Sequence, residues 1–335
     1  MYKALFAFLC IALPASAAPP QKLEVIGTFE EFDEHGDEVE QGASVNVSGV
    51  ACMANGLCFA AADEGRFVQA FKLEKDALFV GQRVYMAETK DKKKSELKDF
   101  DLEGVTAAGD NLIVVGSHSR GRKSCKSPKR NTRIFWGKVT PQHIGTRVPL
   151  SQQAVSLEPL FGQFNQLGAA FDVPLQQNGL NIEAIAAVDG SVLIGFRAPY
   201  PEGEPTRVFV AEFPLSALET GDFSAAALHE IPVSAEKGRG IRGMEQSGED
   251  VFLLLGDAGA GAGSKPGCDQ PSPHLTGTFS LHRWQKGDAA AEHVMDIVPP
   301  DPEWKAEGLL PLDATRFVIF FDGPPNGSPH IYSAD

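Results

Sequence analysis

One short pattern recurs five times along the chain and limits what the chain can fold into. Each copy has a polar residue followed by a small one, then apolar residues, a Gly, Asp or Asn turn, and a second apolar run. This arrangement is typical of a β-hairpin. The polar residues that open the copies are Ser48, Glu103, Glu183, Arg242 and Glu307. Five copies of one supersecondary unit predict a repeat architecture.

A third apolar strand is expected after each copy, and a fourth after the first, third and fourth copies. Four antiparallel strands per repeat form the blade of a β-propeller. The last repeat is one strand short, and residues 21–29 near the N-terminus can supply that strand by pairing with Ile331-Tyr332-Ser333. The sequence therefore predicts an all-β fold, a five-bladed β-propeller closed by the N-terminal strand, with six blades as the alternative.

The second repeat is longer than the others because it holds an insertion at residues 151–167. Val155, Leu160, Phe164 and Leu167 recur there near helical spacing. We expect a short helical insertion that covers an exposed blade edge; a lid over one face is the alternative.

The first 17 residues read as a signal peptide. Lys3 precedes an apolar run, and Ala15-Ser16-Ala17 forms an A-x-A cleavage site. Residues 18–335 are then one propeller domain, periplasmic or secreted, with no membrane span expected elsewhere. The formal net charge of −14 argues against a nucleic-acid partner, which usually calls for a basic footprint.

Four cysteines remain beyond the signal peptide, an even number that suits disulfides in an oxidising compartment. A three-residue turn between Cys52 and Cys58 would place them opposite each other on adjacent strands, which leaves Cys125 with Cys268. A metal site is the alternative, although paired C-x₂-C spacing is missing.

The residues that open the repeats form a ring at one mouth of a propeller channel, because first strands line that channel. Gly or Ala follows each of them, as expected where strands crowd together. Three carboxylates and one guanidinium give this ring an excess of negative charge. Its carboxylates must therefore have raised pKa values, accept hydrogen bonds or bind a cation. Glu103, Glu183 and Glu307 are therefore candidate ligands for a metal such as Ca²⁺. The alternative is that they cap backbone N–H groups of neighbouring blades.

Loops on the same face add a basic cluster over the ring. Six of the fourteen residues at 117–130 are basic, and later loops add further polar groups. Basic residues over a pocket can hold an anion; a plain solvated loop is the alternative. The candidate ligand-binding residues are Arg120, Arg122, Lys123, Arg197, Arg242, Asp257 and Glu307.

His118 is the one histidine at a repeat-equivalent position, and we expect it on the rim of the mouth beside Arg197. Imidazole titrates near neutral pH and can act as a general base. A hydrolase would use His118 with Glu103 or Glu183. The chain has no G-x-S-x-G elbow, H-E-x-x-H helix or P-loop.

Three stretches resemble a known family, the bacterial exported propellers called domain of unknown function 3616. They are Asp101-Leu102-Glu103-Gly104-Val105, Gly116-Ser117-His118-Ser119-Arg120 and Gly238-Arg239-Gly240-Ile241-Arg242. The resemblance implies an exported propeller and brings no assigned activity. The Glu-Gly openings are also similar to those of phytase-like esterase propellers. We expect a protein that binds an anionic small molecule or a glycan at the mouth, with Ca²⁺ as a possible cofactor. A hydrolase of phosphate or carboxylic esters at the same mouth is the alternative.

Overall fold

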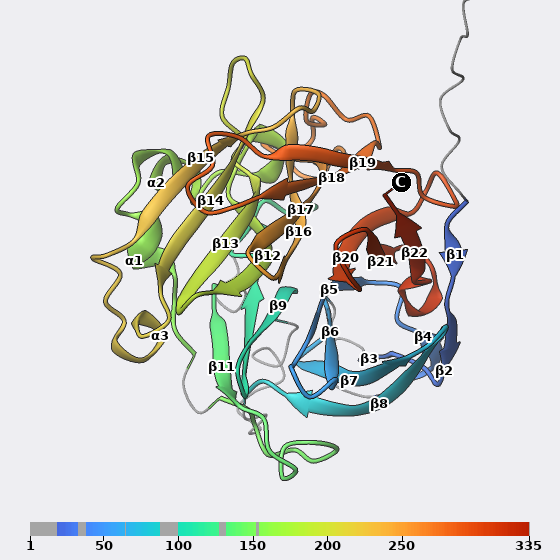
Figure 1. The fold of residues 1–335 in the computed structure, drawn as a ribbon. Coiled ribbons are helices and arrows are strands. Elements are labelled where there is room, and N and C mark those ends of the chain that lie inside the picture. Colours follow the sequence, from blue (N-terminus) through green and yellow to red (C-terminus); the bar gives the residue numbers. More distant parts are fainter. Residues whose placement is uncertain are drawn as a thin grey trace, which may run out of the picture.

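The fold is a five-bladed β-propeller, seen along its axis in the computed structural model of Figure 1. The structure describes residues 19–32, 38–63, 65–87, 100–126, 132–151 and 154–334, so the expected signal peptide lies outside it. Five sheets surround a centre, and each first strand contacts the first strands of its two neighbours. The five-bladed prediction is confirmed, and the six-bladed alternative is wrong.

The blades follow the repeats in chain order. Blade 1 holds β5 (Val47–Cys52), β6 (Cys58–Ala62), β7 (Phe67–Glu74) and β8 (Ala77–Tyr85). Blade 2 holds β9 (Leu102–Ala108), β10 (Asn111–Gly116) and β11 (Ile134–Lys138). Blade 3 holds β12 (Asn181–Val188), β13 (Ser191–Ala198), β14 (Arg207–Pro214) and β15 (Ala227–Pro232). Blade 4 holds β16 (Arg239–Ser247), β17 (Asp250–Asp257), β18 (Phe279–Trp284) and β19 (Glu292–Ile297). Blade 5 holds β20 (Lys305–Pro311), β21 (Arg316–Asp322) and β22 (His330–Ser333).

The N-terminal segment closes the ring, as predicted. β1 (Gln21–Lys22) pairs with β22, so that Gln21 faces Ile331 and Lys22 faces His330. The chain then crosses to blade 1, where β2 (Glu24–Ile26) adds to β8 in a parallel pair. A short hairpin of β3 (Glu30–Phe32) and β4 (Glu38–Ala43) follows. This one segment joins the last blade to the first.

The insertion in blade 2 covers that blade's outer edge. Val155 forms an isolated bridge with Ile134 of β11, in the place of a fourth strand. The short helices α1 (Glu158–Phe161) and α2 (Asn165–Ala170) then bury Leu160 and Leu167 in the cluster between blades 2 and 3. The other helical segments are α3 (Ala217–Thr220) and the 3₁₀ turns η1 (Leu175–Gln177) and η2 (Pro325–Gly327). The insertion is an edge cover rather than a lid.

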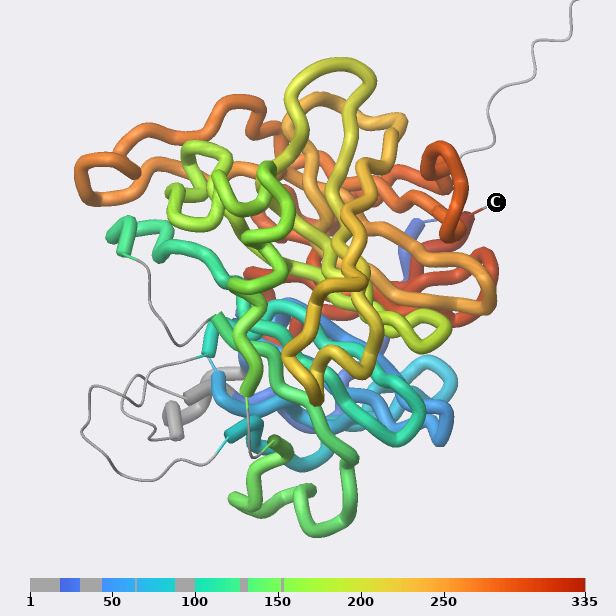
Figure 2. Tube along the Cα trace, turned by 90° about the vertical axis from the view of Figure 1, so that its left-hand side faces the viewer, coloured from blue at the N-terminus to red at the C-terminus, as the bar shows by residue number. Residues whose placement is uncertain are grey.

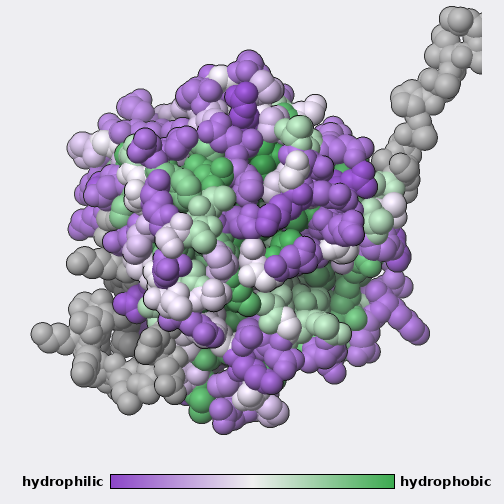
Figure 3. Space-filling view, turned by 60° about the vertical axis from the view of Figure 1, so that its left-hand side comes forward, coloured by the Kyte–Doolittle hydropathy of each residue, from purple (hydrophilic) through white to green (hydrophobic). Residues whose placement is uncertain are grey.

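Hydrophobic side chains fill the spaces between neighbouring blades, as expected for strands that are buried on both faces. The outer surface seen in Figure 3 is mostly hydrophilic, with hydrophobic residues visible in its hollows. The side view in Figure 2 shows the loops that extend beyond the sheets. Among the described residues, no helix has both the length and the apolar character needed to cross a bilayer.

Candidate functional site

A β-bulge in the first strand of every blade presents the residue that opens the repeat. In each blade the register shifts around this residue, which is left without a partner on the second strand. A bulge re-aims a side chain and often lies beside a functional site. The five extra residues are Ser48, Glu103, Glu183, Arg242 and Glu307. The predicted ring therefore has a local structural cause that recurs in all five blades.

Small residues follow the ring because the first strands approach one another closely. A Cβ on Gly49 would lie 2.6 Å from the carbonyl oxygen of Glu103, and one on Gly243 would collide with that of Glu307. Two positions beyond the ring, apolar residues of all five first strands surround a space of about 10 Å³. They are Val50, Val105, Ile185, Met244 and Leu309. The mouth is thus closed from below by this apolar layer.

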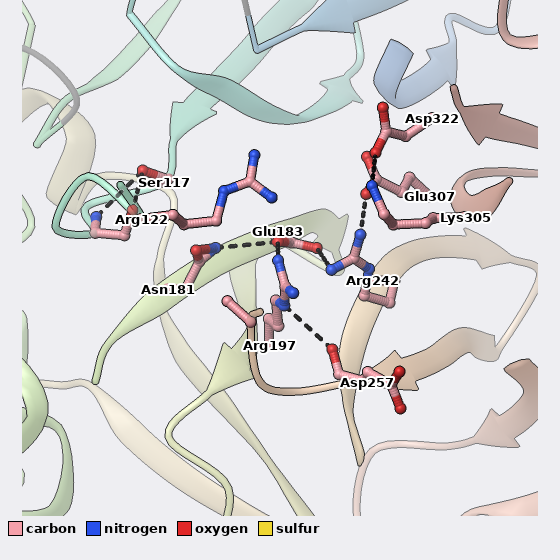
Figure 4. A network of polar contacts seen from close by, with 12 residues as sticks. Ser117, Arg122, Asn181, Glu183, Arg197, Arg242, Asp257, Lys305, Glu307 and Asp322 are labelled. Carbon is pink, nitrogen blue, oxygen red and sulfur yellow. Dashed lines mark hydrogen bonds and ion pairs between the residues drawn. The ribbon is translucent and has the colours of Figure 1, made fainter. Parts of the chain in front are cut away.

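Two guanidinium groups neutralise the carboxylates at the centre of the mouth (Figure 4). Glu183 pairs with Arg197 through Nη1 at 2.7 Å and with Arg242 through Nη1 at 2.9 Å. Arg242 also pairs with Glu307. All four side chains are about nine-tenths buried or more. Glu183 and Glu307 therefore find side-chain donors, and the expected capping of backbone N–H groups is not seen at these two residues.

Glu103 differs from the other two ring carboxylates in the shift of its pKa. Burial raises the pKa of its carboxyl well above the ordinary range, and the nearby charges of Glu183, Asp101 and Asp63 raise it further. Arg122 offsets part of this rise. The ring was expected to carry excess negative charge, and both the raised pKa of Glu103 and the second guanidinium, that of Arg197, reduce that excess.

The three ring carboxylates do not form the expected calcium site. Arg242 binds both Glu183 and Glu307, where a cation would need their oxygens. Within the described ranges, no group of three or more His, Cys, Asp or Glu side chains is arranged to hold a metal ion. The metal-ligand hypothesis for Glu103, Glu183 and Glu307 therefore does not fit this arrangement.

The mouth contains two cavities that share Arg122 and Arg197. The larger has a volume of about 490 Å³ and also contacts Lys123, Arg242 and Lys305. The smaller has a volume of about 60 Å³ and is mostly acidic. Its acidic residues are Asp63, Asp101, Glu103, Glu183, Glu307 and Asp322. We call them the basic cavity and the acidic cavity.

Two predicted ligand-binding residues, Asp257 and Arg120, each line a cavity, but their charged groups are bonded to other groups of the protein. The Asp257 carboxylate pairs with Arg239 and accepts the N–H groups of Thr276 and Gly277. Arg120 pairs with Asp172 at 2.9 Å and donates to the Cys125 carbonyl at 3.0 Å. These two side chains shape the loops of the mouth.

The basic loop of blade 2 is tied to the long loop of blade 4. Both predicted disulfides are present, Cys52–Cys58 between β5 and β6 and Cys125–Cys268 between the two loops. Ser264 Oγ also donates to the Lys123 carbonyl at 2.9 Å, and Gln176 Nε2 donates to the carbonyl of Arg122 at 2.9 Å. These ties fix the backbone that carries Arg122 and Lys123 over the mouth.

His118 does not lie on the rim, and this expectation is wrong. Its side chain is 2% exposed and meets Phe161 of α1 edge to face, with ring centroids 5.5 Å apart. Nδ1 lies 2.8 Å from the Gly116 carbonyl oxygen, which it can reach only as a donor. Burial lowers the pKa of His118 to about 4, so the ring is neutral at neutral pH. His118 lines neither cavity. A hydrolase at this mouth would therefore need a different base.

Sequence reasoning missed several residues of the mouth. Asp63 and Asp322 line the acidic cavity at the ends of second strands, where Arg197 and Asp257 also lie in their own blades. Equal position in the repeat was a signal that could have identified them. Trp304 lines the basic cavity from the segment before β20, and no motif marks it.

The chain belongs to the family described as "Protein of unknown function (DUF3616)", whose sequence model matches residues 46–135 and 140–315. A search of curated proteins finds no match. Solved structures with a similar fold include a catalytically inactive virginiamycin B lyase from Staphylococcus aureus with quinupristin. It is 8% identical with a TM-score of 0.36, over 88% of this chain and 68% of that one. Another is the Cps50 (Swd1) β-propeller domain of Myceliophteria thermophila, 11% identical with a TM-score of 0.40, over 89% of this chain and 100% of that one. The expected similarity to phytase-like esterase propellers is not supported by these matches.

Proposed function

We propose that the protein is an exported binding protein that holds a small anion in the basic cavity. The observation that carries this proposal is Arg242 at the base of the mouth. Its side chain is 3% exposed, and its Nε has no hydrogen-bond partner among the described residues. A buried donor without an acceptor costs about 1–3 kcal/mol. An anion that reaches this group would recover part of that energy.

The charges around Arg242 favour the same kind of ligand. Burial and the neighbouring Arg197 lower the pKa of Arg242 to about 10, which still leaves it protonated at neutral pH. Arg122, Lys123 and Lys305 add further positive charge to the lining of the cavity. The acidic members of this lining are Asp257 and Glu303, and Asp257 is already paired with Arg239. Arg197 and Arg242 are paired with the ring carboxylates and Lys305 is paired with Asp322, so the exposed Arg122 and Lys123 supply most of the positive charge that supports an anionic ligand.

Calorimetric titration with inorganic phosphate, phenyl phosphate and benzoate tests the proposal. Arg122→Gln combined with Lys123→Gln should weaken binding at least tenfold, because charge-assisted hydrogen bonds each contribute about 1.5–3 kcal/mol. Lys126→Gln is the matched control, since Lys126 is exposed on the same loop and lines neither cavity. A double variant that binds like the wild type would refute the proposal, as would a wild type that binds none of the three anions.

A further inference from the structure

The lining of the basic cavity consists of two chemical kinds of side chain. One kind is charged, and the other is apolar or very small. No described residue of this lining has a hydroxyl or a neutral amide side chain. Guanidinium and ammonium groups form their strongest hydrogen bonds with ionised acceptors, so this lining favours a ligand with a concentrated negative charge over one whose polar groups are neutral hydroxyls. The lining therefore suits a ligand that separates its charge from an apolar body.

The apolar wall is built from three side chains of blades 4 and 5. Phe279 begins β18 and is almost fully buried, whereas Leu275 is 41% exposed on the preceding loop. Trp304 is half-buried and packs against Phe321, with ring centroids 5.7 Å apart. Packing on one side holds the indole in place while the residue lines the cavity. A held aromatic ring offers a flat surface on which another ring can stack.

The third part of the lining is the run of small residues at 259–262, which brings the backbone close to any ligand. The Gly259 carbonyl accepts Arg197 Nη2, and the Gly261 carbonyl accepts Gln176 Nε2 at 3.0 Å. In a trans peptide the N–H points away from the carbonyl of the preceding residue. The Ala262 N–H therefore points away from Gln176, and it has no backbone acceptor among the described residues. The run therefore brings the backbone to the cavity without large side chains.

We propose that the ligand is an aryl or heteroaryl acid, whose carboxylate or phosphate meets the guanidinium groups while its ring lies against Trp304. The volume of about 490 Å³ falls within the range for small-molecule sites. This inference rests on the proposed function, because it names the class of anion that the basic cavity holds. It favours an aromatic acid over the glycan that the sequence left open.

Matched pairs of acids test this inference by calorimetry at several temperatures. Phenyl phosphate should bind at least tenfold more tightly than glucose 6-phosphate, and 2-naphthoate at least tenfold more tightly than glucuronate. Burial of the aromatic ring should also give the aryl acids a negative heat-capacity change on binding. Trp304→Leu should remove most of the preference within each pair, and Trp304→Phe should keep it.

A second variant avoids the packing of Trp304 against Phe321. Leu275→Ser changes an exposed side chain of the same wall, and Val148→Ser is its control because Val148 is similarly exposed at 44% and lines neither cavity. Leu275→Ser should weaken phenyl phosphate binding several-fold without changing the affinity for inorganic phosphate, and Val148→Ser should change neither.

The outcomes separate this inference from the proposed function. If sugar acids bind as tightly as aryl acids, or if Trp304→Leu and Leu275→Ser leave the preference unchanged, the aryl inference is wrong while anion binding stands. If the wild type binds no acid of either pair and no inorganic phosphate, both proposals are wrong.

Discussion

The two cavities at the mouth have opposite charges although they lie side by side and share two residues. Five cations and two acids line the basic cavity, whereas six acids and three cations line the acidic one. Arg122 and Arg197 belong to both. The difference arises from which loops and strand ends surround each cavity. The repeated bulge decides where a side chain goes, and the residue type in each blade decides the charge found there.

The cavities also differ in what holds their residues in place. Asp101, Asn181 and Asp322 of the acidic cavity lie at or beside the ends of strands. Arg122 and Lys123 of the basic cavity lie on a loop that is tied to the loop of blade 4. The basic cavity thus depends more on contacts between loops than the acidic cavity does, although the loop of blade 2 contributes to both.

Removing the disulfide between these loops should have the largest effect. Cys125 and Cys268 are separated by 143 residues, and the chain-entropy model gives about 5 kcal/mol for a loop of that size. Cys125→Ser with Cys268→Ser should therefore lower the free energy of unfolding by several kcal/mol, as measured by urea denaturation. It should also weaken anion binding, because Arg122 and Lys123 lose their fixed backbone.

The second disulfide provides the control. Cys52 and Cys58 are only 6 residues apart, so the same model gives about 2 kcal/mol. Cys52→Ser with Cys58→Ser should destabilise the protein less and leave anion affinity unchanged. Equal losses of affinity in the two double variants would contradict the dependence of the basic cavity on its loop tie.

Arg242→Met is expected to have the next largest effect, because Arg242 joins the acids of one cavity to the cations of the other. Removing one partner of a buried ion pair costs about 3–5 kcal/mol, since the remaining charges are left uncompensated. Adding Glu307→Gln should restore part of this loss, because Glu307 pairs with Arg242 and is then neutral, whereas Glu183 keeps its pair with Arg197.

Arg122→Met is the matched control for that variant. The Arg122 side chain is 52% exposed, and exposed ion pairs contribute about 1 kcal/mol or less. Chemical denaturation of the wild type and of the three variants at one pH gives their free energies of unfolding and checks this order of stability. If Arg242→Met were no more destabilising than Arg122→Met, the central ion-pair cluster would not stabilise the fold.

The sequence predicted the parts of this molecule that depend on position in the repeat. The blades and the ring of bulge residues repeat five times along the chain. The closure by β1 supplies the strand that the last repeat lacks. Both disulfides were also predicted, one from a turn and the other by elimination. These features follow from patterns that repeat along the sequence or from the number of cysteines.

The sequence could not predict features that depend on one local backbone angle or on a loop without a motif. His118 has a positive φ of 54°, and its ring lies in the core against Phe161 although its neighbour Ser119 lines the acidic cavity. The charge of Glu103 depends on its burial and on three other acids that the fold brings near it. Trp304 lies in the connection before β20, and no motif of the repeat marks it as a residue that lines a cavity.

The smallest expected effect concerns Glu103, and it separates this acid, whose pKa is raised, from the paired acids of the ring. The usual pKa of Glu is about 4.3, so the unfolded chain releases the proton of this carboxyl near that pH. Because the pKa of Glu103 is raised in the folded protein, the folded state keeps the proton to a higher pH. Between the usual and the raised pKa, the free energy of unfolding therefore falls as pH rises. Glu103→Gln resembles the protonated form and lacks this pH dependence. The variant should gain stability relative to the wild type as pH rises through this window, because the wild type progressively loses the contribution of the bound proton. Glu183→Gln should instead be destabilised across neutral pH, because Arg197 and Arg242 lose a charged partner. Urea denaturation over a pH series decides the matter, and a constant difference between wild type and Glu103→Gln at every pH would show that the pKa of Glu103 is not raised in the folded protein.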